Sequence, residues 1–220
     1  MKRYALYFAP PPGPLAETAA RWLGRDAETG ARLAQPHPAL EGLTVSARRY
    51  GFHATLKAPF RLAEGLTEDD LIAAVEVFGA GVRPFAVAGL RLAALDGFLA
   101  LIPEGDTVAL NAFAAEVVIR FDRFRAPMTE AERARRAPER LTPHQRDLLE
   151  SYGYPYVLDE FRFHMTLTDR LSPEEDAHLR PLAQTLFAPV LPAPLALRDI
   201  VVFGEGADGM FHHVHRARIG

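Results

Sequence analysis

The chain has 220 residues, 49% of them hydrophobic, and a net charge of −3 at pH 7. A chain of this length can bury a core by itself, as one domain or as two small lobes. It contains no cysteine, which excludes disulfides and thiolate metal sites and suits a reducing cytoplasm. The slightly negative charge provides no general attraction to nucleic acid.

The N-terminal stretch MKRYALYFAPPPG has an apolar run that is short and ends at prolines, so we expect a strand over residues 4–8 and no secretory signal. No segment approaches the roughly 20 apolar residues needed to cross a bilayer. The sequence therefore predicts a cytoplasmic protein with no membrane partner.

Strands and helices alternate through the first half. Residues 14–24 have helical spacing, with proline near the start and glycine at the end. A strand is expected over 52–57, and Thr67 is a good N-cap for a helix reaching about residue 78. The apolar runs 85–94 and 98–102 flank Asp96-Gly97, a pair typical of a hairpin turn.

A further helix begins at Asp106 or Thr107. Prolines then divide residues 126–155 into short helical pieces, which we interpret as a connector. A strand over 161–168, a helix over 172–187, and a closing strand pair at 195–203 and 210–219 complete the chain.

Each half thus has the order strand, strand, helix, two-stranded ribbon. This order predicts an α+β protein with a duplicated bilobal fold, in which two antiparallel-sheet lobes carry helices outside and enclose a cleft. The predicted single domain, 1–220, divides into about 1–125, the connector 126–155, and 156–220.

One short motif occurs in both halves, as FHATLK at residues 52–57 and FHMTLT at 163–168. Alternate side chains of a strand share a face, so His53, Thr55 and Lys57 should point one way. In the second copy Arg162, His164, Thr166 and Thr168 should share a face. A single copy would be typical of an ordinary core or surface histidine, whereas two copies favour a shared site in the cleft.

Two imidazoles in one cleft can supply a general base and a general acid when their neighbours separate their pKa values. A threonine two residues after each histidine adds a hydroxyl donor for the oxygens of a phosphoryl group. The pattern indicates attack on a phosphodiester, requires no cofactor or metal, and leaves open which histidine is the acid.

These motifs resemble those of the two-histidine phosphoesterase superfamily, over essentially the whole chain. The resemblance implies catalytic residues His53, His164, Thr55 and Thr166, without metal. RYGFHATLKAPF (49–60), RRAPERLTPHQ (135–145) and GYPYVLDEFRFHMTLTDRL (153–171) are similar to a branch of uncharacterised proteins encoded beside phosphonate-degradation genes. That branch implies a small cyclic phosphodiester of ribose or a nucleotide as substrate.

Four more residues are candidates for substrate binding, each with a structural alternative. Lys57 is either a phosphate ligand or a surface lysine. Arg162, two residues before His164 on the same face, can contact phosphate, and so can Arg49 if the first motif strand extends that far back without a bulge at Gly51. The alternative for Arg49 is a loop position. Tyr7 either lines the cleft or is a half-buried strand residue.

Other readings stay open. The cluster FHHVH, with His212, His213 and His215, invites a metal site, but surface histidines are the default. The arginines between 120 and 146 fit a solvated connector or a basic patch, and residues 126–155 form either a linker or a lid. The alternatives to the enzyme are processing of short RNA ends, either 2′,3′-cyclic phosphates or 2′-5′ linkages, and a module that binds a phosphate ligand without turnover. Oligomeric state is not predicted.

Overall fold

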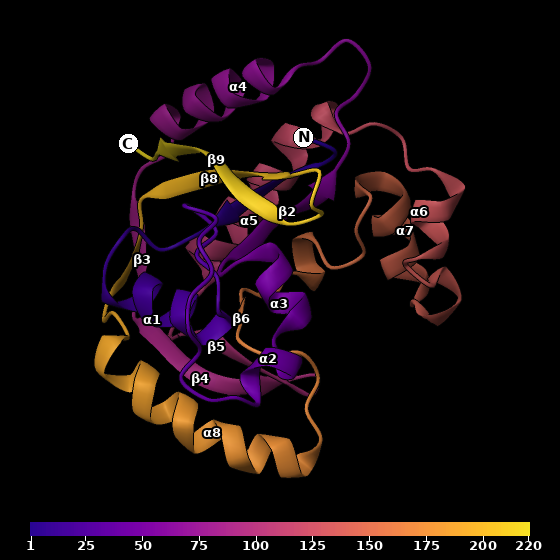
Figure 1. The fold of residues 1–220 in the computed structure, drawn as a ribbon. Coiled ribbons are helices and arrows are strands. Elements are labelled where there is room, and N and C mark those ends of the chain that lie inside the picture. Colours follow the sequence, from indigo (N-terminus) through magenta and orange to yellow (C-terminus); the bar gives the residue numbers. More distant parts are fainter.

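The computed structural model describes all 220 residues. Its main element is a seven-stranded sheet in the order β4-β5-β6-β2-β1-β8-β9, in which every neighbouring pair is antiparallel (Figure 1). The strands are β1 (Tyr4–Phe8), β2 (Ala54–Phe60), β4 (Gly89–Leu95), β5 (Phe98–Glu104), β6 (Met165–Thr166), β8 (Asp199–Glu205) and β9 (Phe211–Arg218). A separate pair joins β3 (Phe85–Val87) to β7 (Leu195–Leu197). The α+β class with antiparallel sheets is confirmed.

Helices cover the outside of this sheet, and one helical segment stands out from the body at the right of Figure 1. That segment contains α6 (Glu130–Ala134) and α7 (Pro143–Tyr152). The other helices are α1 (Pro14–Leu23), α2 (Leu40–Leu43), α3 (Val45–Tyr50), α4 (Glu68–Gly81), α5 (Val108–Phe121) and α8 (Pro173–Phe187). No helix is both long and apolar enough to cross a membrane.

The predicted helix ends are confirmed where a cap specifies them. Thr67 and Ser172 each form a capping box with the residue three positions on, and Gly24 ends α1 in the left-handed conformation. The short helices α2 and α3 were not predicted, because each is too short to show an apolar period.

The two halves of the chain exchange their hairpins. The β4–β5 hairpin from the first half pairs with β6 of the second motif, while the C-terminal β8–β9 hairpin pairs with β1 beside the first motif. The sheet is therefore not divided into consecutive lobes at about 1–125 and 156–220. Strand order along the chain does not specify which strands pair, so the sequence did not reveal this exchange.

The two motif strands meet at the centre of the sheet through one bridge, Ala54 to Met165. The second motif strand is much shorter than the predicted 161–168, since only Met165–Thr166 has ladder pairing. A 3₁₀ turn at Leu158–Glu160 directs the chain into the sheet just before it. The fully buried Trp22 fixes this region by donating its indole N–H to the carbonyl oxygen of Leu167 at 2.8 Å.

Candidate active site

The bridge between Ala54 and Met165 determines how the two motifs face each other. In an antiparallel pair, one step from this bridge places His53 opposite Thr166 and Thr55 opposite His164. Directly opposed residues share a face and lie roughly 5 Å apart, and diagonal ones roughly 7–8 Å. The two histidines and two threonines thus form a four-residue group with a histidine at each end of one diagonal, and all four line one cavity.

Both imidazoles are anchored in the same way. Nδ1 of His53 lies 2.8 Å from the carbonyl oxygen of Gly51, and Nδ1 of His164 lies 2.7 Å from that of Arg162. Because a carbonyl oxygen can only accept, each Nδ1 carries the proton and donates it. Nε2 is therefore the nitrogen left for chemistry on both rings.

Gly51 makes the His53 anchor possible. It ends α3 with φ 76° and ψ 176°, a conformation that only glycine adopts readily. A Cβ at this position would also lie 2.4 Å from the Cβ of Ala27. The glycine thus turns the chain from helix to strand and aims its own carbonyl at His53.

The two Nε2 atoms differ in their present partners. Nε2 of His53 accepts a hydrogen bond from the Thr55 hydroxyl at 3.2 Å, whereas Nε2 of His164 has no protein partner. A threonine hydroxyl rotates freely about its C–O bond, so Thr55 can redirect its proton to a phosphoryl oxygen. Both Nε2 atoms are then available to a ligand.

Burial lowers the pKa of both histidines. For His53 the loss of hydration outweighs the Gly51 hydrogen bond, and with the nearby charges of His164 and His213 it lowers the pKa to about 4. For His164 burial also lowers the pKa, while the Arg162 hydrogen bond and the Asp96 carboxylate oppose it. The neutral form is thus most strongly favoured at His53, and only His164 has a carboxylate that favours its charged form.

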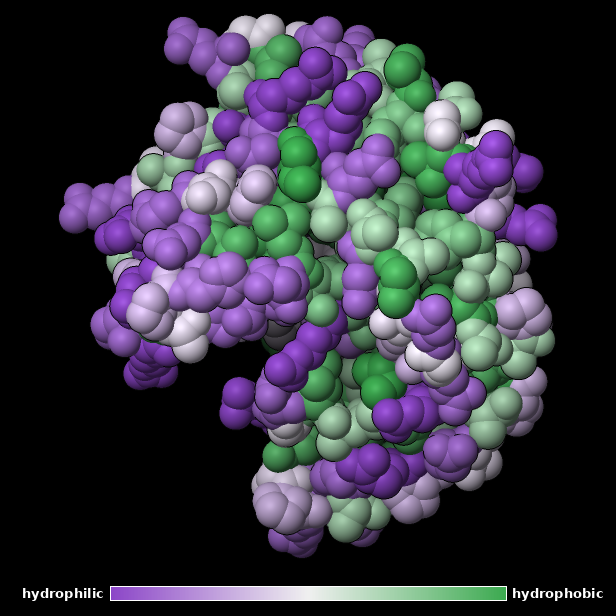
Figure 2. All heavy atoms as spheres, turned by 180° about the vertical axis from the view of Figure 1, so that it is seen from behind, coloured by the Kyte–Doolittle hydropathy of each residue, from purple (hydrophilic) through white to green (hydrophobic).

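The cavity has a volume of about 620 Å³ and its lining includes seven arginines. The segment 126–155 forms one wall, through Met128, Glu132, Arg135, Arg136 and Tyr154. Figure 2 shows this segment from behind, at the left, as a mainly hydrophilic surface separated by a notch from the lower part of the molecule. The connector is therefore part of the candidate site.

Lys57 does not reach the cavity, so its prediction as a phosphate ligand is wrong. An extra residue in β2 opposite the Leu6–Tyr7 step reverses the side-chain alternation after Thr55. Lys57 is consequently buried, 3% exposed, and its ammonium donates to the Asp122 carboxylate at 3.0 Å and to the carbonyl oxygen of Val118 at 3.3 Å.

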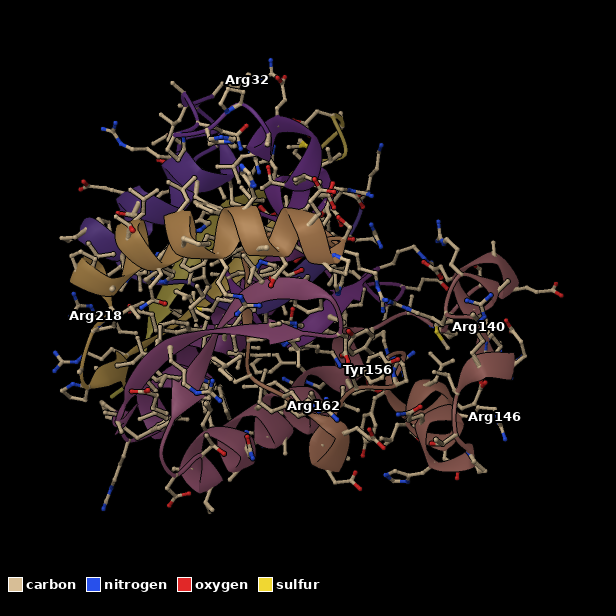
Figure 3. The ribbon with its side chains drawn as sticks, turned by 90° about the horizontal axis from the view of Figure 1, so that it is seen from below. Arg32, Arg140, Arg146, Tyr156, Arg162 and Arg218 are labelled. Carbon is tan, nitrogen blue, oxygen red and sulfur yellow. The ribbon has the colours of Figure 1, made fainter.

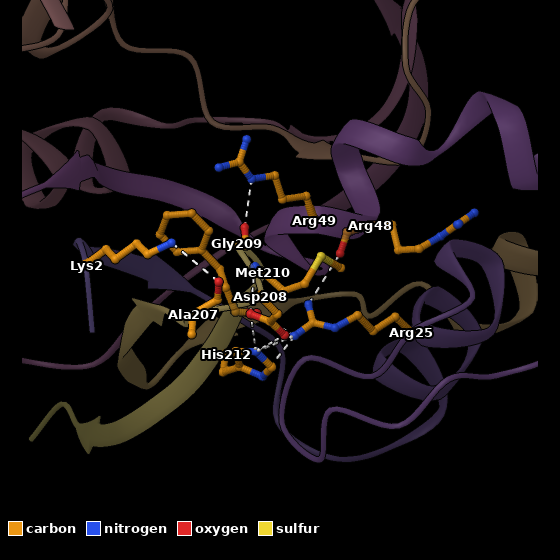
Figure 4. Close-up of polar contacts among 10 residues, drawn as sticks. Lys2, Arg25, Arg48, Arg49, Ala207, Asp208, Gly209, Met210 and His212 are labelled. Carbon is orange, nitrogen blue, oxygen red and sulfur yellow. Dashed lines mark hydrogen bonds and ion pairs between the residues drawn. The ribbon is translucent and has the colours of Figure 1, made fainter.

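Arg49 borders the cavity but belongs to α3, not to an extended motif strand. Its guanidinium donates to the carbonyl oxygen of Gly209 at 2.9 Å (Figure 4) and to the Glu205 carboxylate at 2.8 Å. The condition on which its phosphate contact was predicted is not met, because Gly51 interrupts the strand. Arg49 instead ties α3 to the β8–β9 turn.

Arg162 lies beside a second, smaller hollow of about 300 Å³ that shares Thr55, Phe98, Tyr154 and His164 with the main cavity. Its side chain is exposed and forms no ion pair. Figure 3 shows Arg162 near Tyr156, whereas Arg140 and Arg146 lie on the outlying helical segment at the right. The structure thus brings Arg162 to the edge of the site, away from the main arginine-lined wall.

Tyr7 is among the residues that line the cavity, but it is buried against His53, so it is not half-buried and is not free to stack on a ligand base. Its ring stacks on the imidazole at 3.8 Å between centroids. The three C-terminal histidines have separate partners: His212 contacts Asp208, His213 contacts Glu28, and His215 contacts Glu76. No group of three or more histidine, aspartate or glutamate side chains in the protein is arranged to hold a metal ion.

Several lining residues were not predicted as site residues. Arg135 and Arg136 were noticed only as part of an arginine-rich stretch, and Tyr154 only as part of a family-like segment. Asp169 caps α3 by accepting from the N–H groups of Ser46 and Ala47, a contact across more than half the chain. In the sequence the arginines were visible as a stretch that acidic residues only partly balance, but the direction of each side chain depends on how the connector folds back.

The family described as a protein of unknown function, DUF1045, matches residues 55–212. The protein named ribose 1,5-bisphosphate phosphokinase PhnN is 40% identical in Janthinobacterium sp. (strain Marseille), over 95% of this chain and 49% of that one. The protein of the same name in Laribacter hongkongensis (strain HLHK9) is 38% identical, over 77% of this chain and 40% of that one. The chain thus spans about half the length, or less, of these curated relatives.

A solved structure described as a phosphoesterase aligns with 100% of this chain and 99% of its own, at 10% identity and a TM-score of 0.45. The family match covers well over half of the sequence, including Thr55, His164 and Thr166. The chain therefore belongs to the DUF1045 family.

Proposed function

We propose that this protein is a metal-independent phosphodiesterase that hydrolyses a small cyclic phosphodiester of ribose or a nucleotide. The observation that carries the proposal is the pair of histidines, each with Nδ1 anchored on a carbonyl oxygen and Nε2 free for a ligand, on one cavity with two threonines. Such a group supplies a base, an acid and two neutral hydroxyl donors, which suits a phosphodiester with one negative charge.

In the proposed reaction, Nε2 of His53 takes a proton from water as the water oxygen attacks phosphorus. The bond from phosphorus to the leaving ring oxygen breaks, and protonated His164 gives its Nε2 proton to that oxygen. The product is a phosphomonoester with a free hydroxyl. The lowered pKa of His53 favours the base role, and the Asp96 carboxylate near His164 favours the acid role.

The names of the curated relatives support a ribose phosphate as the substrate class. The chain lacks the G-x-x-x-x-G-K-[ST] pattern with which P-loop kinases bind phosphates, so it has no P-loop for the kinase activity in their name. Its only lysines are Lys2 and Lys57, and neither follows glycine. We also propose a role for this chain in phosphonate metabolism, which the resemblance of its motifs implies.

The test is hydrolysis of a ribose 1,2-cyclic phosphate, a nucleoside 2′,3′-cyclic phosphate and a 2′-5′ dinucleotide in the presence of EDTA. We expect turnover of a cyclic phosphate that survives chelation and falls at least about 10³-fold in both His53→Ala and His164→Ala. His144→Ala is the matched control, because that histidine is exposed and pairs with Asp159 away from the cavity. Activity abolished by EDTA, or retained in either site variant, contradicts the proposal, and turnover of only the dinucleotide supports RNA-end processing.

A further inference from the structure

The seven arginines that line the cavity fall into two groups. Four are held by carboxylates: Arg3 and Arg49 both pair with Glu205, Arg61 pairs with Glu132, and Arg125 pairs with Asp122. The other three, Arg135, Arg136 and Arg170, form no ion pair and no side-chain hydrogen bond within the protein. The cavity therefore has guanidinium groups whose donors are unused.

Two of the unpaired arginines are adjacent and come from the same wall. Arg135 and Arg136 follow α6 in the segment that borders the cavity. The guanidinium of Arg136 lies 4.9 Å from the centre of the Tyr154 ring, so it is positioned by a cation–π contact and not by a carboxylate. A planar guanidinium stacked in this way keeps its in-plane N–H groups free for a ligand.

The position of these two arginines is fixed by contacts on the surrounding residues. Glu132 closes the capping box of α6 with Thr129 and accepts hydrogen bonds from Arg61 at 3.0 and 3.1 Å, which ties α6 to the residue after β2. Arg133 pairs with Glu150 and so joins α6 to α7. The carboxylates of Glu132 and Glu150 are thus already paired with other arginines, and Arg135 and Arg136 have no carboxylate partner.

Arg135 and Arg136 line the same cavity as His53, Thr55, His164 and Thr166. A small ligand with its reacting phosphate at the histidines can therefore extend to this wall of the 620 Å³ cavity, a volume typical of sites that enclose a whole small molecule.

The histidine–threonine group and the wall that carries Arg135 and Arg136 differ in charge. The histidines and threonines provide mostly neutral donors, which suit a singly charged diester. Arg135 and Arg136 provide two permanent positive charges, which suit a dianionic phosphomonoester bound by charge-assisted hydrogen bonds. We infer that the substrate is a cyclic phosphodiester of a sugar that also carries a separate terminal phosphomonoester, and that Arg135 and Arg136 bind this second phosphate. This inference rests on the proposed function and extends it to the substrate class.

The test compares a ribose 1,2-cyclic phosphate with and without a phosphate on its 5-hydroxyl. We expect kcat/KM to be at least about 100-fold higher for the phosphorylated compound, mainly through KM, since roughly 10-fold per charge-assisted contact is typical. Arg135→Gln/Arg136→Gln should reduce that ratio at least about 10-fold. The preference should also weaken as salt concentration rises.

Arg140→Gln is the matched control, because Arg140 lies in the same segment but is 84% exposed and does not line the cavity. It should keep the full preference. An equal kcat/KM for the two compounds in the wild type overturns the inference, as does an unchanged ratio in the double variant. Loss of the preference in Arg170→Gln alone overturns the assignment to Arg135 and Arg136.

A binding measurement separates this inference from the proposed function. Ribose 5-phosphate has a phosphomonoester and no phosphodiester bond to be cleaved. The His53→Ala/His164→Ala variant should therefore bind it in calorimetry. Adding Arg135→Gln/Arg136→Gln to that variant should weaken binding at least about 10-fold. That result supports the subsite even if no cyclic phosphate is hydrolysed. Turnover of the unphosphorylated compound without any binding of ribose 5-phosphate leaves the proposed function standing and overturns the subsite.

Discussion

The ring of Tyr7 lies flat against the imidazole of His53, with 3.8 Å between the ring centroids and 22° between the planes. Tyr7 sits on β1 directly opposite Thr55 of β2, so the strand pairing that builds the sheet also places this aromatic ring against the histidine. The stack excludes water from one face of the imidazole, and that exclusion contributes to the burial that lowers the pKa of His53 to about 4.

Replacing Tyr7 tests whether the ring, and not the hydroxyl, has this effect. Tyr7→Phe keeps the stack, so it should leave the pKa of His53 unchanged and keep the rate within about 3-fold of wild type. Tyr7→Ala should raise the His53 pKa toward 6.5, because water then solvates the charged form. NMR titration of the imidazole, assigned with His53→Gln, measures the shift, and an unchanged pKa in a folded Tyr7→Ala protein contradicts this account.

The two threonines should contribute to the rate in similar measure. Thr55→Val and Thr166→Val each remove one hydroxyl donor at the same size, and each should lower kcat by on the order of 10²-fold. Thr55→Ser and Thr166→Ser keep the donor and should restore most of the activity.

Thr168 provides the contrast within the same motif. It is buried, and its hydroxyl accepts the N–H of Leu99 at 2.9 Å. Thr168→Val should therefore lower the free energy of unfolding by about 1–3 kcal/mol and leave kcat of the folded protein unchanged. A large loss of kcat in Thr168→Val, or none in Thr166→Val, would reverse the assignment of donors.

The pH dependence of kcat/KM should show a maximum on the acidic side of neutrality. The base, His53, must be neutral, so activity is lost as pH falls through its pKa of about 4. The acid, His164, must be protonated, so activity is lost as pH rises through its pKa, which burial lowers below 6.5. The maximum is thus expected between about 4 and 6.5.

A bell-shaped profile alone does not say which histidine gives which limb, because interchanged protonation states produce the same curve. Asp96→Asn resolves the two. Asp96 raises the pKa of His164 and sits in a hairpin turn at φ 48°, a conformation that asparagine also tolerates. The variant should move the alkaline limb to lower pH and leave the acidic limb in place, whereas a shift of the acidic limb would exchange the two roles.

The sequence predicted the local features of this site better than its long-range ones. His53, Thr55, His164 and Thr166 were recognisable because the same six-residue pattern occurs twice, and they do line one cavity. The hairpin at Asp96-Gly97 and the cap at Thr67 were predicted from residues adjacent in the chain. Each of these features depends on interactions over a few residues, which sequence patterns record directly.

The features that were missed depend on distant partners. The direction of Lys57 changed because β1 and β2 pair with an irregular register, which no property of FHATLK specifies. The exchange of the two hairpins depends on which strand edges meet in three dimensions. Arg135 and Arg136 became candidates only when the connector was found against the cavity and their neighbours were found already paired.

The buried Lys57 should act in stability and not in catalysis. Burial lowers the pKa of Lys57, and Asp122 opposes this, while hydrogen bonds from Arg125 and Lys57 lower the pKa of Asp122 against the effect of its own burial. Lys57→Met removes the buried charge and leaves Asp122 paired with Arg125, so it should change the free energy of unfolding by about 1 kcal/mol or less.

Asp122→Asn does the opposite, because it leaves the 3% exposed ammonium of Lys57 without a counter-charge. We expect a loss of about 2–3 kcal/mol in urea unfolding, less than for a fully buried pair since Asp122 is 26% exposed. Glu150→Gln breaks the exposed pair with Arg133 and, as the control, should cost less than about 0.5 kcal/mol. Both Lys57→Met and folded Asp122→Asn should keep kcat/KM within about 2-fold. A loss of 100-fold in Lys57→Met would instead place the lysine on the substrate, in conflict with its position against α5.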